Sequence, residues 1–231
     1  MKTTSNRWRE YAAAEIPGSL DPFPVFFEYF KTDDLILDLG CGYGRICRDL
    51  SELGFRKLIG LDFNIQGLGR GRLEAPRANP PRYCAGNALS LPFRDAVFTG
   101  AIMQAFLTTL VDRADREKAL DEIFRVLGPS GLMYAAVFGQ TWENPIYRKR
   151  YEEGLAQGLE KGTFEAVDPR TGRFEYRARH FTREELETLF NRCGFYFLAH
   201  QTATFTTRTG NRINGHVIVA GKKSQTAPTR A

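Results

Sequence analysis

Short apolar runs alternate with amphipathic stretches through the first 140 residues of the chain. Apolar residues that recur with the 3.6-residue period predict helices, and short apolar runs bounded by glycine or proline predict buried strands. Strands that alternate with helices in this way indicate a parallel, doubly wound α/β sheet. The expected strands are 35–39, 57–61, 82–85, 96–102 and 131–138, and the expected helices are 43–53, 65–74 and 114–127.

The last third of the chain predicts one more helix and two more strands. Thr182-Arg183-Glu184-Glu185 is a capping-box pattern, so a helix is expected from there to Asn191. Strands are expected at 195–203 and 213–220, joined by a hairpin at 204–212. The Gly-Pro-Ser-Gly sequence at 128–131 predicts a turn.

Three segments break this rhythm. Residues 1–32 are rich in aromatic residues and interrupted by prolines, which predicts short helices near 6–14 and 22–31 and a lid segment. Residues 140–180 are interpreted as a cap insertion that selects the substrate; the alternative is a long surface excursion. The insertion is expected to hold a polar helix from Arg148 to Glu160 and an edge strand or hairpin arm at 174–179. A disordered tail is expected at 222–231, in a single domain of residues 1–231.

A glycine-rich loop follows the first predicted strand. Gly40, Gly42 and Gly44 carry no Cβ atoms, so a ligand can lie against the backbone at the start of the next helix. The second predicted strand ends at Asp62, about 20 residues past the loop, where a carboxylate can accept both hydroxyls of a ribose. The pattern therefore predicts a nucleoside-containing cofactor at the carboxyl edge of the sheet.

The position of Asp38 separates two classes of cofactor. Dinucleotide-binding loops typically have the spacing G-x-G-x-x-G and hold a pyrophosphate. Here the spacing is G-x-G-x-G, and Asp38 places a negative charge two residues before the first glycine. This charge favours a cationic ligand, such as the ammonium and sulfonium of S-adenosylmethionine, over NAD. A nicotinamide-dependent oxidoreductase is the alternative enzyme class.

Further motifs follow in a consistent order: Gly86-Asn87-Ala88, Leu91-Pro92-Phe93, the segment from Ala96 to Gln104, and a helix and turn from Ala119 to Gly131. Together with the loop, they resemble the class I S-adenosylmethionine-dependent methyltransferases of the small-molecule "type 11" kind. The resemblance covers roughly residues 33–139, with a weaker match at 180–220. It implies a Rossmann-like, mostly parallel seven-stranded sheet with an antiparallel last strand. It also implies methyl transfer from S-adenosylmethionine, with S-adenosylhomocysteine as product.

The resemblance also implies roles for individual residues. Asp38 would hold the ammonium, Gly40 and Gly42 would lie under the cofactor, and Asp62 would take the ribose hydroxyls. The remaining cofactor-binding positions are Phe63 on the adenine face, Asn87 and the adjacent Ala88 at the adenine amino group, and Gln104 at the methionine end or the substrate. The family often has Asp at position 87. A helix cap is the alternative role for Asp62, and core packing is the alternative role for Phe63.

A general base is less clearly indicated. Methyl transfer from a sulfonium needs an aligned nucleophile and exclusion of water, so a thiolate or neutral amine acceptor requires no base. His180, Tyr11 and Gln104 are the catalytic candidates, and Tyr147 and Glu143 are further possibilities. A packed histidine is the alternative interpretation of His180.

Composition and charge limit the cellular location, the metal content and the partners that the sequence predicts. No apolar stretch reaches the ~18 residues needed to span a bilayer. The four cysteines show no C-x-x-C pair and the three histidines share no ligand spacing, so we expect no metal site and a cytoplasmic protein. The net charge is +5 without dense basic blocks, so nucleic acid is not the expected partner.

The alternative functions are a non-catalytic cofactor-binding or partner-binding module, and an RNA or protein methyltransferase. The segment Met103-Gln104-Ala105-Phe106 lacks the Asn-Pro-Pro-Tyr type of string of nucleic-acid amino methyltransferases. The oligomeric state is not indicated.

Overall fold

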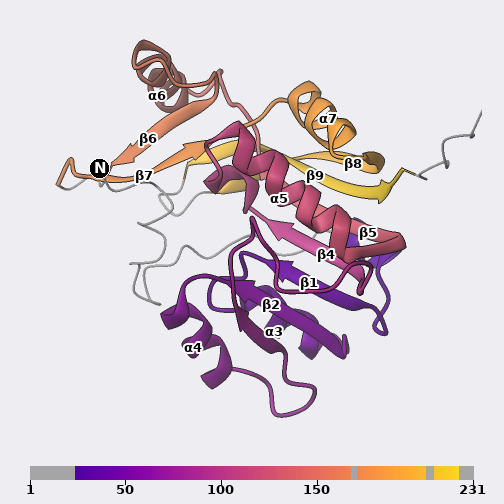
Figure 1. The fold of residues 1–231 in the computed structure, drawn as a ribbon. Coiled ribbons are helices and arrows are strands. Elements are labelled where there is room, and N and C mark those ends of the chain that lie inside the picture. The colour runs from indigo at the N-terminus through magenta and orange to yellow at the C-terminus, as the bar shows by residue number, and fades with distance from the viewer. Residues whose placement is uncertain (1–23, 168–170, 207–210, 224–231) are drawn as a thin grey trace, which may run out of the picture.

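A computed structural model describes residues 24–167, 171–206 and 211–223 (Figure 1). The first half contains α2 (Pro24–Tyr29), β1 (Leu35–Leu39), α3 (Arg45–Glu52), β2 (Lys57–Asp62), α4 (Ile65–Leu73), β3 (Arg82–Ala85), β4 (Phe98–Gln104) and the 3₁₀ turn η1 (Leu107–Thr109). The second half contains α5 (Arg113–Val126), β5 (Leu127–Phe138), α6 (Pro145–Ala156), β6 (Thr163–Val167), β7 (Phe174–Arg179), α7 (Arg183–Arg192), β8 (Phe195–Thr206) and β9 (Arg212–Lys222).

Seven strands form one sheet in the order β3-β2-β1-β4-β5-β9-β8. Strands β1 to β5 pair in parallel, whereas β9 is antiparallel to both β5 and β8. The predicted α/β class, the doubly wound sheet and the antiparallel last strand are therefore confirmed. The chain reverses its direction of travel across the sheet between β1 and β4, and such a switch point places ligands beyond the carboxyl ends of the strands.

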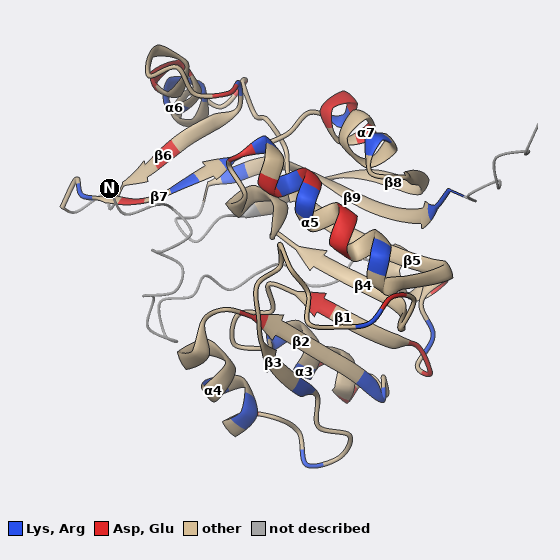
Figure 2. Ribbon diagram, in the orientation of Figure 1, with Lys and Arg blue, Asp and Glu red and all other residues tan. Residues whose placement is uncertain are grey.

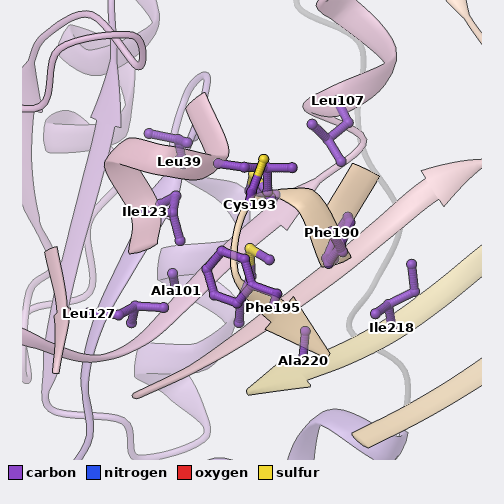
Figure 3. Packing of buried hydrophobic residues seen from close by; sticks show 14 of the residues in the cluster. Leu39, Ala101, Leu107, Ile123, Leu127, Phe190, Cys193, Phe195, Ile218 and Ala220 are labelled. Atoms are coloured by element: carbon purple, nitrogen blue, oxygen red, sulfur yellow. The ribbon is translucent and has the colours of Figure 1, made fainter. Parts of the chain in front are cut away.

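Both faces of the sheet are covered. One core lies between the sheet and helices α5 and α7, and Figure 3 shows Ile123 of α5 and Phe190 of α7 around the same core as Ala101 and Ala220. The other core includes Phe26 of α2 and Ile46 and Leu50 of α3. The N–H group of Glu185 is held by the Thr182 hydroxyl, and the Glu185 carboxylate accepts from Thr182 N–H, which confirms the predicted capping box of α7.

The segment 140–180 forms a helix and a two-stranded sheet. Helix α6 begins after Asn144, whose side chain accepts hydrogen bonds from the N–H groups of Ile146 and Tyr147. Strands β6 and β7 form an antiparallel pair separate from the main sheet, and α6 packs against β6 (Figure 1). The sequence predicted β7 as an edge strand or hairpin arm but missed β6. The inner side of this unit joins the second core through Tyr147, Tyr151 and Phe164.

Several predicted boundaries differ from the structure. The fourth strand lies two residues later than expected, at Phe98–Gln104, because Ala96 has a left-handed backbone (φ 56°) that separates it from the strand. The segment 128–131 is an irregular part of β5 rather than a turn before it, since both Leu127 and Leu132 pair with β4. The C-terminal hairpin extends closer to its tip than predicted, with β8 reaching Thr206.

Parts of the predicted lid and tail fall outside the described residues. Helix α2 confirms the expected helix near 22–31, whereas the helix near 6–14 and Tyr11 lie outside the described ranges. The tail expected at 222–231 begins too early, since Lys222 pairs as the last residue of β9; residues 224–231 lie outside the described ranges. Among the described helices, none is both long enough and apolar enough to cross a membrane.

Candidate functional site

The loop between β1 and α3 is built on left-handed glycines. Gly40, Gly42 and Gly44 have φ values of 73°, 58° and 74°. The N–H groups of Gly40 and Cys41 both donate to the carbonyl of Leu61 on β2, at 2.8 and 3.1 Å. A Cβ atom at Gly40 would overlap the ring of Phe106. Glycine is therefore required here by the backbone conformation and, at Gly40, by close packing as well.

Asp62 ties this loop to the end of β2. Its Oδ2 accepts from Gly42 N–H at 2.9 Å, and its Oδ1 accepts from Asn64 N–H at 2.8 Å. The helix cap of α4 is Asn64, whose Oδ1 accepts from Gly67 N–H, so the alternative role of Asp62 as the helix cap is excluded. Burial raises the pKa of Asp62, and its hydrogen bonds oppose that rise. A carboxylate has about four acceptor sites, so Asp62 retains acceptor capacity beyond its backbone hydrogen bonds.

Asp38 is a buried acid at the carboxyl end of β1, with an exposed fraction of 3%. Its Oδ2 accepts from the Cys47 thiol at 3.4 Å. Burial raises the pKa of Asp38 to about 7, the Cys47 hydrogen bond lowers it, and the negative charge of Asp62 raises it further. A cation that entered this site would favour the carboxylate form. Asp38 and Asp62 therefore place two acids beside the glycine loop, one without an N–H donor among the described residues and one that accepts from Gly42.

Parallel pairing brings the other predicted cofactor residues to the same edge of the sheet. Asp62 pairs with Ala85, and Asn87 lies two residues beyond. Asn87 is exposed, and its Oδ1 accepts from Leu89 N–H at 2.9 Å, so it also shapes its own turn. Gln104 is the last residue of β4 and is buried.

Phe63 and Ala88 are half-buried near this edge. Phe63 follows Asp62 directly, and Ala88 packs against the core on the α5 side of the sheet. The parallel order β3-β2-β1-β4 therefore brings the ends of four strands, and the predicted cofactor residues that follow or end them, to one edge of the sheet.

His180 lies inside an aromatic core, beside Phe138 at the carboxyl end of β5. It is 2% exposed, its Nδ1 is 2.7 Å from the Tyr151 hydroxyl, and its ring contacts Tyr147 and Phe164. Burial lowers its pKa to about 3, with a smaller contribution from Arg150. A base of this strength is poorly matched to neutral pH, so the placement supports the packing interpretation of His180.

The other candidate bases have structural partners. Tyr147 is buried in the same aromatic core. Glu143 is exposed and accepts from the Asn214 side chain at 2.7 Å. Among the described ranges, no group of three or more His, Cys, Asp and Glu side chains is arranged to hold a metal ion.

Tyr83 is a residue of this region that the sequence reasoning missed. A Cβ atom at Gly44 or Gly60 would overlap its ring, and one at Gly71 would lie 3.2 Å from it. The Tyr83 hydroxyl donates to the Gly44 carbonyl at 3.4 Å. One aromatic ring thus fills the space left by glycines of the loop, of β2 and of α4. Glycines inside a predicted strand and a predicted helix were the available signal.

A second missed feature holds the segment that follows Asn87. Glu122 accepts from Leu91 N–H at 2.6 Å, and Arg125 donates to the carbonyls of Leu91 and Phe93. The two side chains also form an ion pair at 2.7 Å on α5. Two charged residues of one helix therefore fix the course of the loop after β3.

The sheet order, the switch point and the glycine loop define a doubly wound, Rossmann-like cofactor-binding fold. Residues 37–135 match the family described as the methyltransferase domain. The crystal structure of an S-adenosylmethionine-dependent methyltransferase from Methanosarcina mazei is 39% identical, with a TM-score of 0.85, over 89% of this chain and 100% of that chain. The chain belongs to the S-adenosylmethionine-dependent methyltransferase family.

Two curated relatives are named for particular acceptors. The Arabidopsis thaliana 24-methylenesterol C-methyltransferase 2 is 30% identical over 57% of this chain, and the match spans only 36% of that protein's length. The demethylmenaquinone methyltransferase of Lactiplantibacillus plantarum is 27% identical, over 87% of this chain and 82% of that protein.

Proposed function

We propose that this chain transfers the methyl group of S-adenosylmethionine to a small organic acceptor. The observation that carries the proposal is the position of two buried acids, Asp38 and Asp62, beside a glycine loop at the switch point of the sheet. In this proposal Asp38 holds the ammonium, Asp62 accepts the ribose hydroxyls, and the backbone at Gly40 and Gly42 lies against the cofactor. Phe63, Asn87 and Ala88 surround the adenine, and Gln104 faces the methionine end.

The proposed reaction needs few catalytic groups from the protein. S-adenosylmethionine supplies an already activated methyl group when bound. The residues of the chain then have to bind, orient the acceptor in line and keep water out. A neutral amine or a thiolate acceptor would need no general base, in accordance with the buried position of His180.

The acceptor is proposed to be a small molecule enclosed by the cap. The relatives named above act on a sterol and on demethylmenaquinone, and both are small organic molecules. Charges of both signs are interspersed along α5 (Figure 2), and its Arg113 and Arg125 are already paired with Glu117 and Glu122. This distribution favours a small molecule over a nucleic acid. The described cysteines are free thiols, which supports a reducing compartment such as the cytoplasm.

Calorimetric titration tests the cofactor. We expect S-adenosylhomocysteine to bind and NAD not to bind. Binding of NAD without S-adenosylhomocysteine would overturn the proposal in favour of an oxidoreductase. Incubation with methyl-labelled S-adenosylmethionine and a panel of sterol, quinone, amine and thiol acceptors then tests catalysis. Tight cofactor binding with no transfer to any acceptor would favour a non-catalytic module, and steeply salt-dependent binding to RNA would favour a nucleic-acid substrate.

A further inference from the structure

Two buried arginines lie where the cap meets the body of the molecule. Arg116 comes from α5 and Arg179 from β7, with exposed fractions of 3% and 4%. Both guanidinium groups lie over the ring of Phe181, at 5.7 and 5.1 Å from its centre. Burial lowers the pKa of Arg179, and the positive charge of Arg116 lowers it further, so the two cations are close enough to repel each other. Such a pair is stable only if carboxylates compensate it.

Glu160 is the acid that both arginines share. It lies in the turn between α6 and β6, and its Oε2 accepts from Arg116 Nη2 at 2.6 Å and lies 3.5 Å from Arg179 Nη1. Arg179 has a second carboxylate, Glu185 of α7, at 3.0 Å. Within the described ranges, the only ion pair of Arg116 is the one with Glu160. Glu160 is 43% exposed, in contrast to the arginines that it neutralises.

Arg116 carries this contact on to the edge of the cofactor site. Its Nη1 donates to the carbonyls of Leu110 and Val111, at 3.0 and 2.7 Å. These residues end the segment that follows β4. The same segment contains Phe106, whose ring packs against Gly40 of the glycine loop. A continuous series of contacts therefore runs from the cap turn, through Glu160 and Arg116, to the residues beside the loop.

We infer that Glu160 is a positioning residue that couples the cap to the segment 105–111 through its ion pairs with two buried arginines. The coupling itself stands on these contacts alone. Its consequence for the acceptor rests on the proposed function, because the cap and the segment 105–111 would then enclose the acceptor next to the cofactor.

Hydrogen exchange on the full chain tests the coupling. In Glu160→Ala we expect amide exchange to accelerate at least tenfold in peptides covering 105–111 and in peptides covering 157–167. Peptides covering 35–45 should be unchanged. Because Glu160 is partly exposed, added formate can enter the space left by its carboxylate and restore the slow exchange. Neutral formamide, of similar size, should not restore it.

Two further variants complete the design. Glu153→Ala removes an exposed acid of the cap helix α6, paired with Lys149 at 3.8 Å, and should leave exchange unchanged in both segments. Glu160→Gln keeps the shape without the charge and should reproduce the acceleration if the alanine variant does not fold. Acceleration confined to 157–167, or rescue by formamide as well as formate, would overturn the inference. If wild-type protein fails to bind S-adenosylhomocysteine, the proposed function fails while the coupling can still be measured.

Discussion

At the scale of single residues, burial raises the pKa of Asp38 to about 7, well above the ~3.9 of an unperturbed aspartate. If Asp38 binds the ammonium of the cofactor, only its carboxylate form can do so. The affinity for S-adenosylhomocysteine should therefore rise as pH increases through 7, and should fall by about tenfold per pH unit well below that value.

Binding at pH 7 should also release about half a proton, because about half of the Asp38 groups are protonated at their pKa. Calorimetry in two buffers of different ionisation enthalpy measures that release. Asp38→Asn should bind more weakly, with no pH dependence in this range. A wild-type affinity that is flat from pH 6 to 8 would rule out the ammonium role of Asp38.

Asp62 accepts a hydrogen bond from the glycine loop and is also proposed to bind the ribose of the cofactor. Two substitutions separate these roles. Asp62→Ala should weaken S-adenosylhomocysteine binding by about 1.5–3 kcal/mol, because charge-assisted hydrogen bonds to the ribose are lost. Asp62→Asn retains one acceptor oxygen for the backbone and should show an intermediate loss by calorimetry.

Asn64→Ala is the matched control for Asp62. It removes the neighbouring cap of α4 and should lower stability more than affinity. If Asp62→Ala bound the ligand as well as the wild-type protein does, the acid would serve the loop alone.

At the scale of elements, the glycine loop depends on backbone conformation. Gly44 has φ 74°, and a Cβ there would overlap the Tyr83 ring, so Gly44→Ala should lower the free energy of unfolding by about 1–3 kcal/mol. Gly69→Ala is the matched control, since it lies inside α4 with open space around its Cβ.

The Gly69 substitution should raise stability by up to about 1 kcal/mol, the difference in helix propensity. Urea unfolding of the two variants measures both effects. Equal effects of the two substitutions would mean that the conformation at Gly44 is not under constraint.

The elements that the sequence predicted well are those whose signals are local. Asp38 and the loop from Gly40 to Gly44 lie within one strand–turn–helix unit, and Asp62 ends the next strand, so spacing along the chain located them. β6 was missed because its strand character depends on pairing with β7, which follows a turn. Glu160 and Arg116 are 44 positions apart, and Tyr83 acts across three elements, so no local pattern indicated their contacts.

At the scale of the whole molecule, a neutral buried histidine makes the fold sensitive to acid. The pKa of His180 is lowered to about 3 in the folded state, whereas an unfolded chain binds the proton near pH 6.5. Stability is therefore undiminished above pH 6.5 and decreases as pH falls from 6.5 towards 3, by up to about 1.4 kcal/mol per pH unit.

His180→Gln removes this group, so its free energy of unfolding should depend less steeply on pH between 6.5 and 4. The number of protons taken up on unfolding should be smaller in the variant than in the wild-type protein by nearly one. Denaturant titrations at several pH values measure this number. His200 and His216 also have lowered pKa values and remain in both proteins, so some pH dependence persists. Identical slopes would mean that His180 is protonated in the folded protein.

The sequence predicted the class of the whole molecule but not how the cap is attached. The alternation of strands and helices predicted the doubly wound sheet, and the family resemblance implied its seven strands and antiparallel last strand. Attachment of the cap instead depends on Tyr147, Tyr151 and Phe164 meeting the sheet, and on arginines buried only because the chain folds back on them. The composition of a long insertion is the same whether its aromatic residues and arginines are buried or exposed, so composition did not predict how the insertion packs.

The ring of Tyr83 also offers a means of external control. Tyr83→Gly would leave a hollow the size of a phenol between the loop, β2 and α4, and hollows of this kind accept small aromatic solutes. The variant should lose affinity for S-adenosylhomocysteine and regain it when p-cresol is added. Cofactor binding would then depend on the concentration of an added small molecule.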